Sequence, residues 1–486
     1  MNSMAKQANP AAAVLPRRAL LLGASAITTA GLAGWRPTGT ATAQPVDDSA
    51  WDGLRQQLRG TLTLPEDGEF GSATALFDPR FDTETPAAVV AAATSDDVRA
   101  AAVFARAHGL PIAARAGGHS YAGASATTGS LIIDVRGLHE IGLDGDLVTV
   151  GAGATVFPVQ SELARTGRAL PVGTCPTVGL AGLTLGGGLG VDSRRYGLTC
   201  DRLTAAELVL PTGATARTSA DALPGLFWAL RGAGGAAGIV TSLTYRTCPA
   251  VAKDIVRLSF PGDSAARALS GWARWLATAP RSVWANVEIS AADGSLGCAM
   301  QIVSAAGEGA GAATELTTAA AVVPTSVDHR TLEPLDAVLR LGGGATASRA
   351  TKVAGSDVVA DLSPAVAETI VAIVSTRLRS GAPGYVLVDP LDGAVRDVPA
   401  DASAFPWRNH TASLQWVVEA PDDPEADRRW IRDAHRTLGA ASSGAYVNYL
   451  EPDETPERYY GTNFSRLREL HRAADPDGRL RLGLTL

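Results

Sequence analysis

Cysteine is scarce in this sequence, with four residues among 486. No two of them form a C-x-x-C pair and none stands at a Cys/His zinc spacing, so no metal site is predicted. A chain of this length can bury a sufficient core without a disulfide framework, although an exported protein could still form one bridge. The four residues are Cys175, Cys200, Cys248 and Cys298.

An excess of positive charge is also missing, because the formal net charge is −7 and the isoelectric point is about 5.6. Such a chain has no basic field to attract nucleic acid or an anionic membrane. Hydrophobic residues make up 46% and charged residues 19%, which is ordinary for a globular protein with a large core. At roughly 150 residues per domain, the length predicts about three structural units.

The N-terminal region has the pattern of an export signal rather than of a domain. Arg17 and Arg18 form a twin arginine, a modest apolar stretch follows, and Ala41-Thr42-Ala43 offers a small-residue cleavage site. The apolar stretch is too short and too rich in Gly, Ala and Thr for a membrane span of about 20 residues. The alternative is an extension with a chance arginine pair. We expect residues 1–43 to be a twin-arginine signal, and the mature protein to be extracytoplasmic or secreted without a membrane anchor.

The first 200 residues after this signal alternate between helical and extended patterns. A strand at 87–92, a helix from Thr94 to His108 and a strand at 111–115 make a βαβ unit with parallel strands. The turn Asp144-Gly145-Asp146 is expected to join strands 131–135 and 147–151. Further elements are expected as a helix at 155–165, a hairpin of 205–210 with 214–218, and a strand at 239–245.

The pattern changes near residue 251, where glycine clusters become rarer. Strands and helices continue to alternate there, and the segment from 446 to 449 is read as a further strand. We predict an α+β fold with an FAD-binding domain at 44–250, a substrate domain at 251–439 and a C-terminal segment at 440–486. The substrate domain is expected to hold an antiparallel sheet backed by helices, with strands at 284–289 and 299–303 and helices at 264–278, 308–320 and 364–380.

A first chemical motif follows the strand at 111–115 and reads Arg115-Ala-Gly-Gly-His119-Ser-Tyr121. Two glycines at a strand end let backbone N–H groups turn inward and bind a diphosphate. The imidazole beside them would be a nucleophile held at a fixed distance. A tight turn carrying a surface histidine is the alternative for this motif on its own.

A second motif begins at Gly173-Thr-Cys175 and continues through six glycines between Gly179 and Gly190. So many glycines disfavour a regular helix or strand, and predict a loop whose amides face a phosphate and a flat ring. The apolar residues interleaved among the glycines argue against a flexible linker. No G-x-G-x-x-G turn with a downstream acid occurs, so this is not a Rossmann fingerprint.

Together these motifs resemble the berberine bridge enzyme-like branch of the vanillyl-alcohol oxidase and p-cresol methylhydroxylase superfamily. The resemblance rests on R-x-G-G-H-S-Y, on G-x-C-P-T-V-G some 56 residues later, and on G-G-G-x-G. It extends from about residue 80 to 480 through the segments 230–240, 405–408 with 414–416, 446–449 and 459–477. Trp407 stands where the family often has His, and Leu480 where an aromatic residue usually closes the tail.

The resemblance implies a bicovalent FAD, joined through its 8α-methyl carbon to His119 and through C6 to Cys175. Two such tethers would hold the ring without burying it, and the cofactor would carry the difficult chemistry. The cofactor-binding residues implied are Arg115, Gly117, Gly118, His119, Ser120, Tyr121, Thr174, Cys175, Val178, Gly179, Gly182, Leu185, Gly186, Gly187, Gly190, Gly238, Ile239, Val240, Tyr446 and Asn448.

The catalytic base is expected to be Tyr446, with Tyr121, Tyr449 and Gln415 as helpers. A free phenol has a pKa of about 10, so such a base needs a nearby cation or hydrogen-bond donor. These side chains could instead merely end hydrogen bonds at a sheet surface. In similar enzymes the position of Val178 faces the reactive flavin carbon, where a small residue admits oxygen; packing alone would also explain a valine.

The sequence therefore predicts an FAD oxidase that takes hydride from an alcohol, a sugar or a secondary metabolite and reduces oxygen to hydrogen peroxide. A dehydrogenase of the same fold with another electron acceptor is one alternative, and a flavin- or ligand-binding protein without turnover is another. The expected partners are a small-molecule substrate and molecular oxygen, with the chain acting as a monomer or homodimer. Substrate identity does not follow from the sequence.

Overall fold

The first sheet mixes parallel and antiparallel pairs in the computed structural model, which describes residues 46–486. Its order is β1-β2-β4-β3, with β4 parallel to both β2 and β3 and β1 antiparallel to β2. Helix α3 (Ser95–Ala107) joins β2 to β3 and begins with a capping box between Thr94 and Asp97. The predicted βαβ unit is confirmed, although β4 lies between its two strands. The strands are β1 (Thr61–Thr63), β2 (Ala88–Ala91), β3 (Ile112–Arg115) and β4 (Leu131–Asp134).

The second sheet is antiparallel, in the order β5-β6-β10-β8-β9. The turn at Asp144-Gly145-Asp146 joins β5 to β6, so the prediction that it joins 131–135 to 147–151 is wrong. The reason is that Ile141–Asp144 forms a strand of its own, while β4 belongs to the first sheet. The strands are β5 (Ile141–Asp144), β6 (Leu147–Gly151), β8 (Leu203–Val209), β9 (Thr215–Ser219) and β10 (Ile239–Arg246), and β7 (Arg168–Ala169) pairs separately with β11 (Cys248–Pro249).

Two local predictions differ from the structure. The glycine-rich segment contains a helix, α5 (Leu180–Leu185), because Leu180, Ala181 and Leu185 are buried and tertiary packing outweighs the weak helix propensity of glycine. The segment 446–449 is not a strand: Val447–Tyr449 forms a single 3-10 turn that follows the short strand β19 (Ser442–Gly444). Both corrections shape the site described below.

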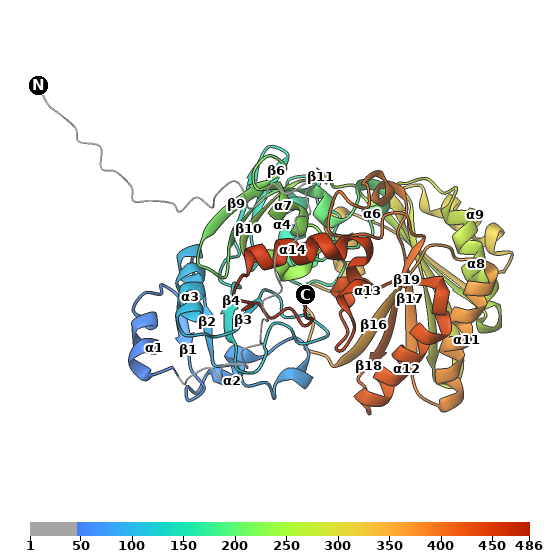
Figure 1. Ribbon diagram of the computed structural model, residues 1–486. Coiled ribbons are helices and arrows are strands. Elements are labelled where there is room, and N and C mark those ends of the chain that lie inside the picture. The colour runs from blue at the N-terminus through green and yellow to red at the C-terminus, as the bar shows by residue number, and fades with distance from the viewer. Residues whose placement is uncertain (1–45) are drawn as a thin grey trace, which may run out of the picture.

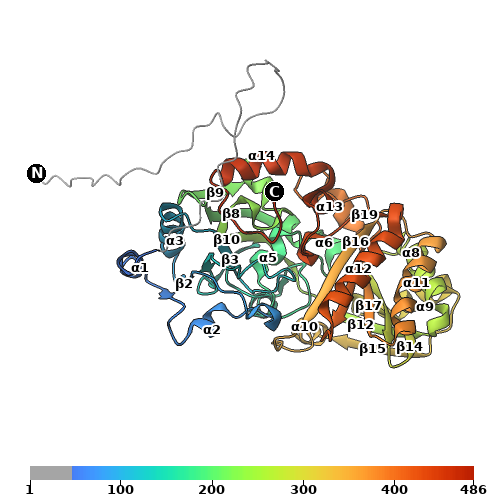
Figure 2. The same ribbon diagram turned by 60° about the horizontal axis from the view of Figure 1, so that its bottom comes forward.

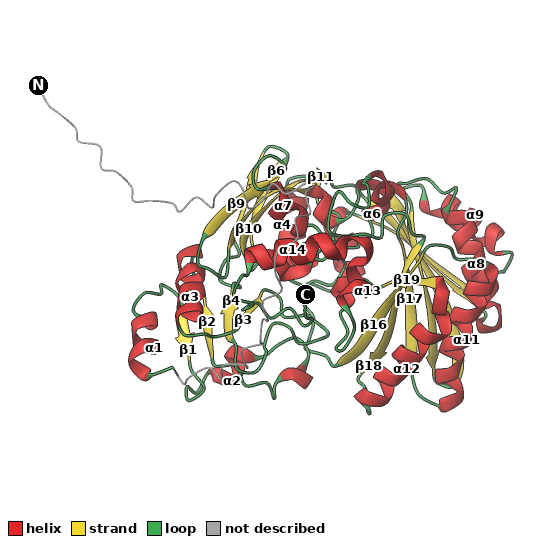
Figure 3. Cartoon of the chain, viewed as in Figure 1, coloured by secondary structure: helices red, strands yellow, loops and turns green. Residues whose placement is uncertain are grey.

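The third sheet has eight antiparallel strands in the order β15-β12-β14-β13-β17-β18-β16-β19. Helices cover its outer face (Figures 1 and 3). These helices are α8 (Ala265–Leu276), α9 (Gly309–Ala320), α11 (Pro364–Ser380) and α12 (Pro424–Leu438). The strands are β12 (Lys253–Phe260), β13 (Trp284–Ala292), β14 (Ser295–Ala305), β15 (Ser326–Leu332), β16 (Lys352–Val359), β17 (Gly384–Pro390) and β18 (Ala412–Glu419).

The two faces of this sheet differ in chemistry because successive side chains point to opposite faces. On the helix-covered face, Val287 lies opposite both Met300 and Val388, and all three are buried. On the other face, Asn286 lies opposite Gln301, and Gln415 lies opposite Leu387. The sheet therefore presents a polar face to the rest of the molecule.

The C-terminal region returns to the first half of the chain. Figure 2 shows α14 lying over the region of β8 and β10. The Tyr460 hydroxyl donates to the Ala233 carbonyl at 3.1 Å, and Leu480 forms a parallel bridge with Ile112 of β3. The remaining helices are α1 (Asp48–Arg55), α2 (Phe70–Thr74), α4 (Val156–Arg165), α6 (Ser193–Tyr196), α7 (Pro224–Ala229), α10 (Pro334–Gly342), α13 (Pro456–Tyr460) and α14 (Phe464–Ala474).

The predicted signal, residues 1–43, lies outside the described residues. Across residues 46–486, no helix combines the length and the apolar character needed to cross a bilayer. The domain limits at 250 and 439 stay predictions.

Candidate active site

Two loops carry the predicted nucleophiles, and their backbones touch. One follows β3 and holds His119; the other precedes α5 and holds Cys175. A Cβ atom on Gly117 would lie 2.3 Å from the Gly179 nitrogen, so a side chain at Gly117 would force the loops apart. Glycine at this contact therefore brings the two loops together.

The surroundings of His119 favour the neutral form of its imidazole. Burial lowers the pKa of His119 to about 4, against a smaller opposing effect of the Thr177 backbone. Its ring stacks on Phe77 with centroids 4.0 Å apart, and its Nε2 lies 3.0 Å from the Thr177 hydroxyl. A neutral ring keeps one nitrogen lone pair available at physiological pH.

Cys175 lies near the same threonine hydroxyl. Its Sγ lies 3.9 Å from the Thr177 hydroxyl, and the residue is half-buried and lines the large cavity between the loops and the third sheet. All four cysteines are free thiols in the structure, but Cys200, Cys248 and Cys298 are buried. The imidazole and the one partly exposed thiol thus meet at a single hydroxyl.

The His119 loop also has the features of an anion cradle. Among the described residues, the backbone N–H groups of 117–121 donate to no acceptor in the chain. Partly buried N–H groups are normally paired, and a run of them in a turn forms a binding site for phosphate. These residues fit the diphosphate of an FAD, as the neutral imidazole and thiol fit its ring.

The glycine-rich segment contributes differently from the prediction. The N–H groups of Gly186, Gly187 and Gly188 donate to Gly182, Thr184 and Tyr446 rather than facing outward. A Cβ atom on Gly186 would lie 2.0 Å from the Asn448 side chain, which donates to the Leu183 carbonyl at 3.0 Å. This segment therefore packs the C-terminal turn against α5.

The cavity has a volume of about 340 Å³ and brings together all five of the predicted catalytic side chains. Gln415 of β18 donates to the Tyr121 hydroxyl at 3.0 Å, and burial raises the pKa of Tyr121 to about 12. Val178 also lies on the cavity wall. The predicted residues on this wall are Tyr121, Thr174, Cys175, Val178, Gly190, Gln415, Tyr446, Asn448 and Tyr449.

The two tyrosines of the C-terminal turn have different surroundings. The Tyr446 hydroxyl accepts hydrogen bonds from the Gly188 N–H at 2.8 Å and from Asn448 at 2.7 Å, and the residue is buried. Within the described part of the chain, the Tyr449 hydroxyl has no hydrogen-bond partner. Burial, and then the charge of Asp389, raises the pKa of Tyr449 above its ordinary range.

Two segments of this chain match known protein families: residues 86–219 match the FAD binding domain, and residues 445–482 match the family described as berberine and berberine like. The chain is 29% identical to the xylooligosaccharide oxidase of Thermothelomyces thermophilus, over 88% of this chain and 92% of that protein. It is 28% identical to the uncharacterized FAD-linked oxidoreductase YgaK of Bacillus subtilis, over 88% and 96%. These matches show an FAD-linked oxidoreductase that is similar to the berberine bridge enzyme-like enzymes.

Solved structures confirm the fold expected for this oxidoreductase. A xylooligosaccharide oxidase from Myceliophthora thermophila in complex with xylobiose superimposes with a TM-score of 0.80 at 25% identity, over 89% of this chain and 98% of that one. A chitooligosaccharide oxidase gives a TM-score of 0.81 at 24% identity, over 90% and 98%. The predicted α+β fold of the berberine bridge enzyme-like type is therefore confirmed.

Several residues predicted to bind the cofactor do not line the cavity. Arg115 is buried and pairs with Asp134 at 2.7 Å, which ties the end of β3 to the end of β4. The residues in the His119 loop, along α5 or at the start of β10 are Gly117, Gly118, Ser120, Gly179, Gly182, Leu185, Gly186, Gly187, Gly238, Ile239 and Val240.

Sequence reasoning missed Asp389, Lys352 and Thr177. Burial raises the pKa of Asp389 to about 6, and Asn286 donates to its carboxylate at 3.2 Å. Lys352 Nζ lies 2.7 Å from Glu419 at the cavity. In the sequence, Asp389 is marked only as an acid at the end of the apolar run of β17. Thr177 lies within the motif G-x-C-P-T-V-G, and no pattern marks Lys352.

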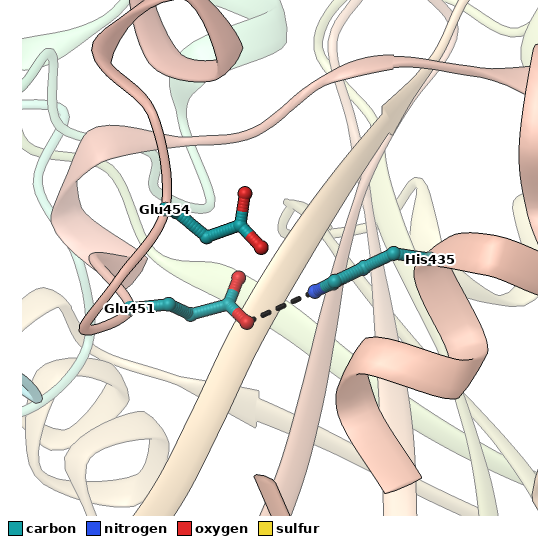
Figure 4. Close-up of side chains that lie close together, drawn as sticks. All are labelled: His435, Glu451 and Glu454. Carbon is teal, nitrogen blue, oxygen red and sulfur yellow. Dashed lines mark hydrogen bonds and ion pairs between the residues drawn. The ribbon is translucent and has the colours of Figure 1, made fainter. Parts of the chain in front are cut away.

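His435 also received no role from the sequence, and it sits in a network of ion pairs (Figure 4). Its Nδ1 lies 2.7 Å from Asp357 and its Nε2 lies 2.9 Å from Glu451. Burial disfavours the charged form, but hydrogen bonds to the two carboxylates outweigh this and raise the pKa of His435 to about 9. With Glu454 nearby the group has the spacing of metal ligands. Both ring N–H groups of the imidazolium are already committed to carboxylates, so the group is an ion-pair network.

Proposed function

We propose that this oxidoreductase is an oxidase that carries FAD on two covalent tethers, His119 and Cys175. The observation that supports the proposal is the meeting of a neutral imidazole and a half-buried thiol at the Thr177 hydroxyl. When bound, FAD supplies the acceptor for hydride and the route of electrons to oxygen, which leaves as hydrogen peroxide. A double tether fixes the ring while leaving the cavity open to a bulky substrate.

Acid precipitation of the purified protein tests the tethers directly. We expect the pellet to be yellow and the supernatant colourless for the wild type. His119→Ala and Cys175→Ala should each keep one tether, and the double variant should release all of its flavin. A colourless wild-type pellet with intact FAD in solution would contradict the proposal.

For the proton-accepting residue we propose Tyr446. Its hydroxyl lies on the cavity and accepts hydrogen bonds from the Gly188 N–H and from Asn448, and both bonds lower its pKa against the effect of burial. Tyr449 also lies on the cavity, but its hydroxyl has no such donor in the described chain, and burial and the charge of Asp389 raise its pKa. Tyr449 would then bind a substrate hydroxyl, while Tyr446 accepts the proton.

For the substrate we propose a polyhydroxylated molecule such as an oligosaccharide. Asn286, Gln301, Asp389 and Gln415 present amide and carboxylate groups on one sheet face, and Trp284 adds an aromatic surface. Amides and carboxylates match sugar hydroxyls as both donors and acceptors. The relatives named for xylooligosaccharides and chitooligosaccharides support the same choice.

Oxygen use separates the proposed oxidase from a dehydrogenase of the same fold. The flavin should bleach under anaerobic conditions with an oligosaccharide and regain its colour within seconds of contact with air, with one peroxide per turnover. A reduced flavin that stays bleached in air until a quinone is added would instead identify a dehydrogenase. Val178→Leu should slow reoxidation without changing the bleaching rate.

We also propose export of the folded protein through the twin arginine at Arg17 and Arg18. Folding before export would let the cofactor attach in the cytoplasm. Replacement of both residues by lysine should leave yellow protein inside the cell, and unchanged secretion would contradict this route.

A further inference from the structure

We infer that the Thr177 hydroxyl is a shared positioning group that activates both flavin tethers together. This inference rests on the proposed double tether. It starts from one oxygen that lies 3.0 Å from His119 Nε2 and 3.9 Å from Cys175 Sγ. No other side chain in the described part of the chain forms hydrogen bonds with both groups.

The number of protons on these groups limits how they can pair. A threonine hydroxyl has one hydrogen to donate and lone pairs to accept with, and a neutral imidazole has one N–H and one lone pair. Burial keeps His119 neutral by lowering its pKa to about 4. The Thr177 hydrogen can therefore point to the imidazole or to the sulfur, but not to both.

Only one of the two arrangements leaves both groups nucleophilic. When His119 Nε2–H donates to the Thr177 oxygen, the lone pair on Nδ1 is free. The Thr177 O–H can then donate to Cys175 Sγ and stabilise the negative charge that the sulfur carries as it attacks. In the reverse arrangement Thr177 donates to Nε2, so the imidazole proton must be on Nδ1, and the sulfur has lost its donor. The direction of one hydroxyl, together with the tautomer of His119, thus decides whether both groups are nucleophilic.

The surroundings fix the remaining freedom of the histidine. Phe77 stacks on the imidazole with planes 21° apart, which sets the plane of the ring, and Thr177 sets its rotation within that plane. Thr177 itself lies two residues from Cys175 and two from Gly179, at the contact between the loops. The hydroxyl is therefore held in place by the same close approach that joins the loops.

The atoms and electrons of each attachment step balance when molecular oxygen is the oxidant. Each tether replaces one C–H bond of the flavin and one N–H or S–H bond of the protein with a C–N or C–S bond. Two protons and two electrons leave for each bond, and one molecule of oxygen takes them as hydrogen peroxide. Thr177 is not consumed, since it only directs where the protons sit before each bond forms.

Peptide mapping of the flavin tests this inference without measuring turnover. Trypsin cuts between the two tethers at Arg136, Arg165 and Arg168, so a doubly tethered flavin joins two otherwise separate peptides. For Thr177→Val we expect the joined peptide to fall at least fivefold, with the His119 and Cys175 links lost together. Thr177→Ser keeps the hydroxyl and should stay within twofold of wild type.

A matched control is Thr155→Val. Thr155 is half-buried near the same loops, and its hydroxyl does not cap the helix that it precedes. This variant should tether flavin as the wild type does. If Thr177→Val does not fold, judged by its melting temperature, the comparison of Thr177→Ala with Thr177→Ser decides instead.

Three results have distinct meanings. Full double tethering in Thr177→Val, or in a folded Thr177→Ala, would overturn the inference. Loss of one link with the other at wild-type level would overturn the coupling. A wild-type protein that releases all of its flavin in acid would overturn the proposed double tether itself.

Discussion

At the scale of single residues, the cavity separates groups that hold structure from groups that are free to act. The Asn448 amide is already bound to the chain, because it donates to the Leu183 carbonyl and to the Tyr446 hydroxyl. Tyr449 and Cys175 face the cavity with fewer commitments. A residue with spare hydrogen-bonding capacity at a cavity wall is the better candidate for contact with substrate or cofactor.

Removal of the hydroxyl should affect the two tyrosines differently. Tyr446→Phe should lower the rate of anaerobic flavin bleaching about 100-fold, in the range attributed to a positioned base. It should also cost about 1–3 kcal/mol of stability, because the buried Gly188 N–H loses its acceptor. Tyr449→Phe should lower the bleaching rate less than tenfold. Stopped-flow bleaching and chemical denaturation measure the two effects, and the opposite ranking of the bleaching rates would identify Tyr449 as the base.

Asp389 predicts a pH dependence on the acid side. Burial raises the pKa of its carboxyl to about 6, so it is ionised above that pH and neutral below it. The ionised form accepts stronger hydrogen bonds from substrate hydroxyls. We expect kcat/KM to fall as pH drops through about 6, mainly through a rise in KM.

Asp389→Asn is the matched variant that tests this fall of kcat/KM at acid pH. It keeps the shape of the side chain and should have a low kcat/KM that does not change between pH 5 and pH 7, in steady-state assays. If kcat/KM of Asp389→Asn still falls below about pH 6 as in the wild type, another group is responsible for this pH dependence.

At the scale of elements, the His435 network joins three pieces of secondary structure. His435 belongs to α12, Asp357 to β16, and Glu451 follows the turn that carries Tyr449. Glu451 also accepts the Ser356 N–H at 3.1 Å, and Asp357 accepts from Arg458 at 2.9 Å. A single imidazolium therefore holds the sheet edge and the C-terminal turn in register.

This network predicts a loss of stability at alkaline pH. The pKa of His435 is raised to about 9 in the folded chain, above its ordinary value of 6.5. Its contribution is therefore complete below pH 6.5 and disappears as pH rises through about 9. Removing one partner of a buried pair costs about 3–5 kcal/mol, so His435→Gln should be less stable by that order at pH 6.5. Urea denaturation should give a difference from wild type that shrinks above pH 9; a constant difference would contradict the assignment.

At the scale of the whole molecule, buried ion pairs connect parts of the chain that lie far apart in sequence. Arg194 of α6 pairs with Asp392 at 2.7 Å and donates to the carbonyls of Leu276, the last residue of α8, and of Ala279 beyond it. The last carbonyls of a helix have no partners within it, so the guanidinium completes the end of α8. Arg194, which follows the glycine-rich segment, thereby connects that segment to α8, one of the helices that cover the third sheet.

Substitution of the buried Arg194 is therefore predicted to lower the stability of the protein strongly. Arg194→Met should lower stability by about 3–5 kcal/mol, because it leaves a buried carboxylate unpaired. Arg281, whose pair with Asp397 is exposed, is the matched control, and Arg281→Met should leave the unfolding midpoint unchanged. Thermal unfolding followed by circular dichroism measures both, and equal midpoints for the two variants would contradict the prediction.

The sequence predicts the site best where chemistry depends on a short motif. His119 and Cys175 were found because each lies in a glycine-rich loop, and the structure brings them to one hydroxyl. Asp389 and Lys352 come from β17 and β16, and only the strand order of the third sheet brings them to the cavity. Strand order depends on non-local packing, which local patterns do not encode.

The elements show the same limit. Helix α11 was predicted at 364–380 and has these bounds, because a proline start and a glycine end mark it locally. The pairing of the strand at 131–134 was predicted wrongly, because a short and partly exposed strand, β5, gives a weak hydrophobic signal. The helix α5 was missed because its burial, not its propensity, stabilises it.

The contact of Asn448 with Gly186 has a consequence for biosynthesis. The amide fills the space beside a glycine in the first half of the chain, although its own residue lies in the second half. A nascent chain that has not yet reached this turn lacks one wall of the cavity. We therefore expect a cofactor to load only after the turn at 447–449 has been synthesised and has packed against α5.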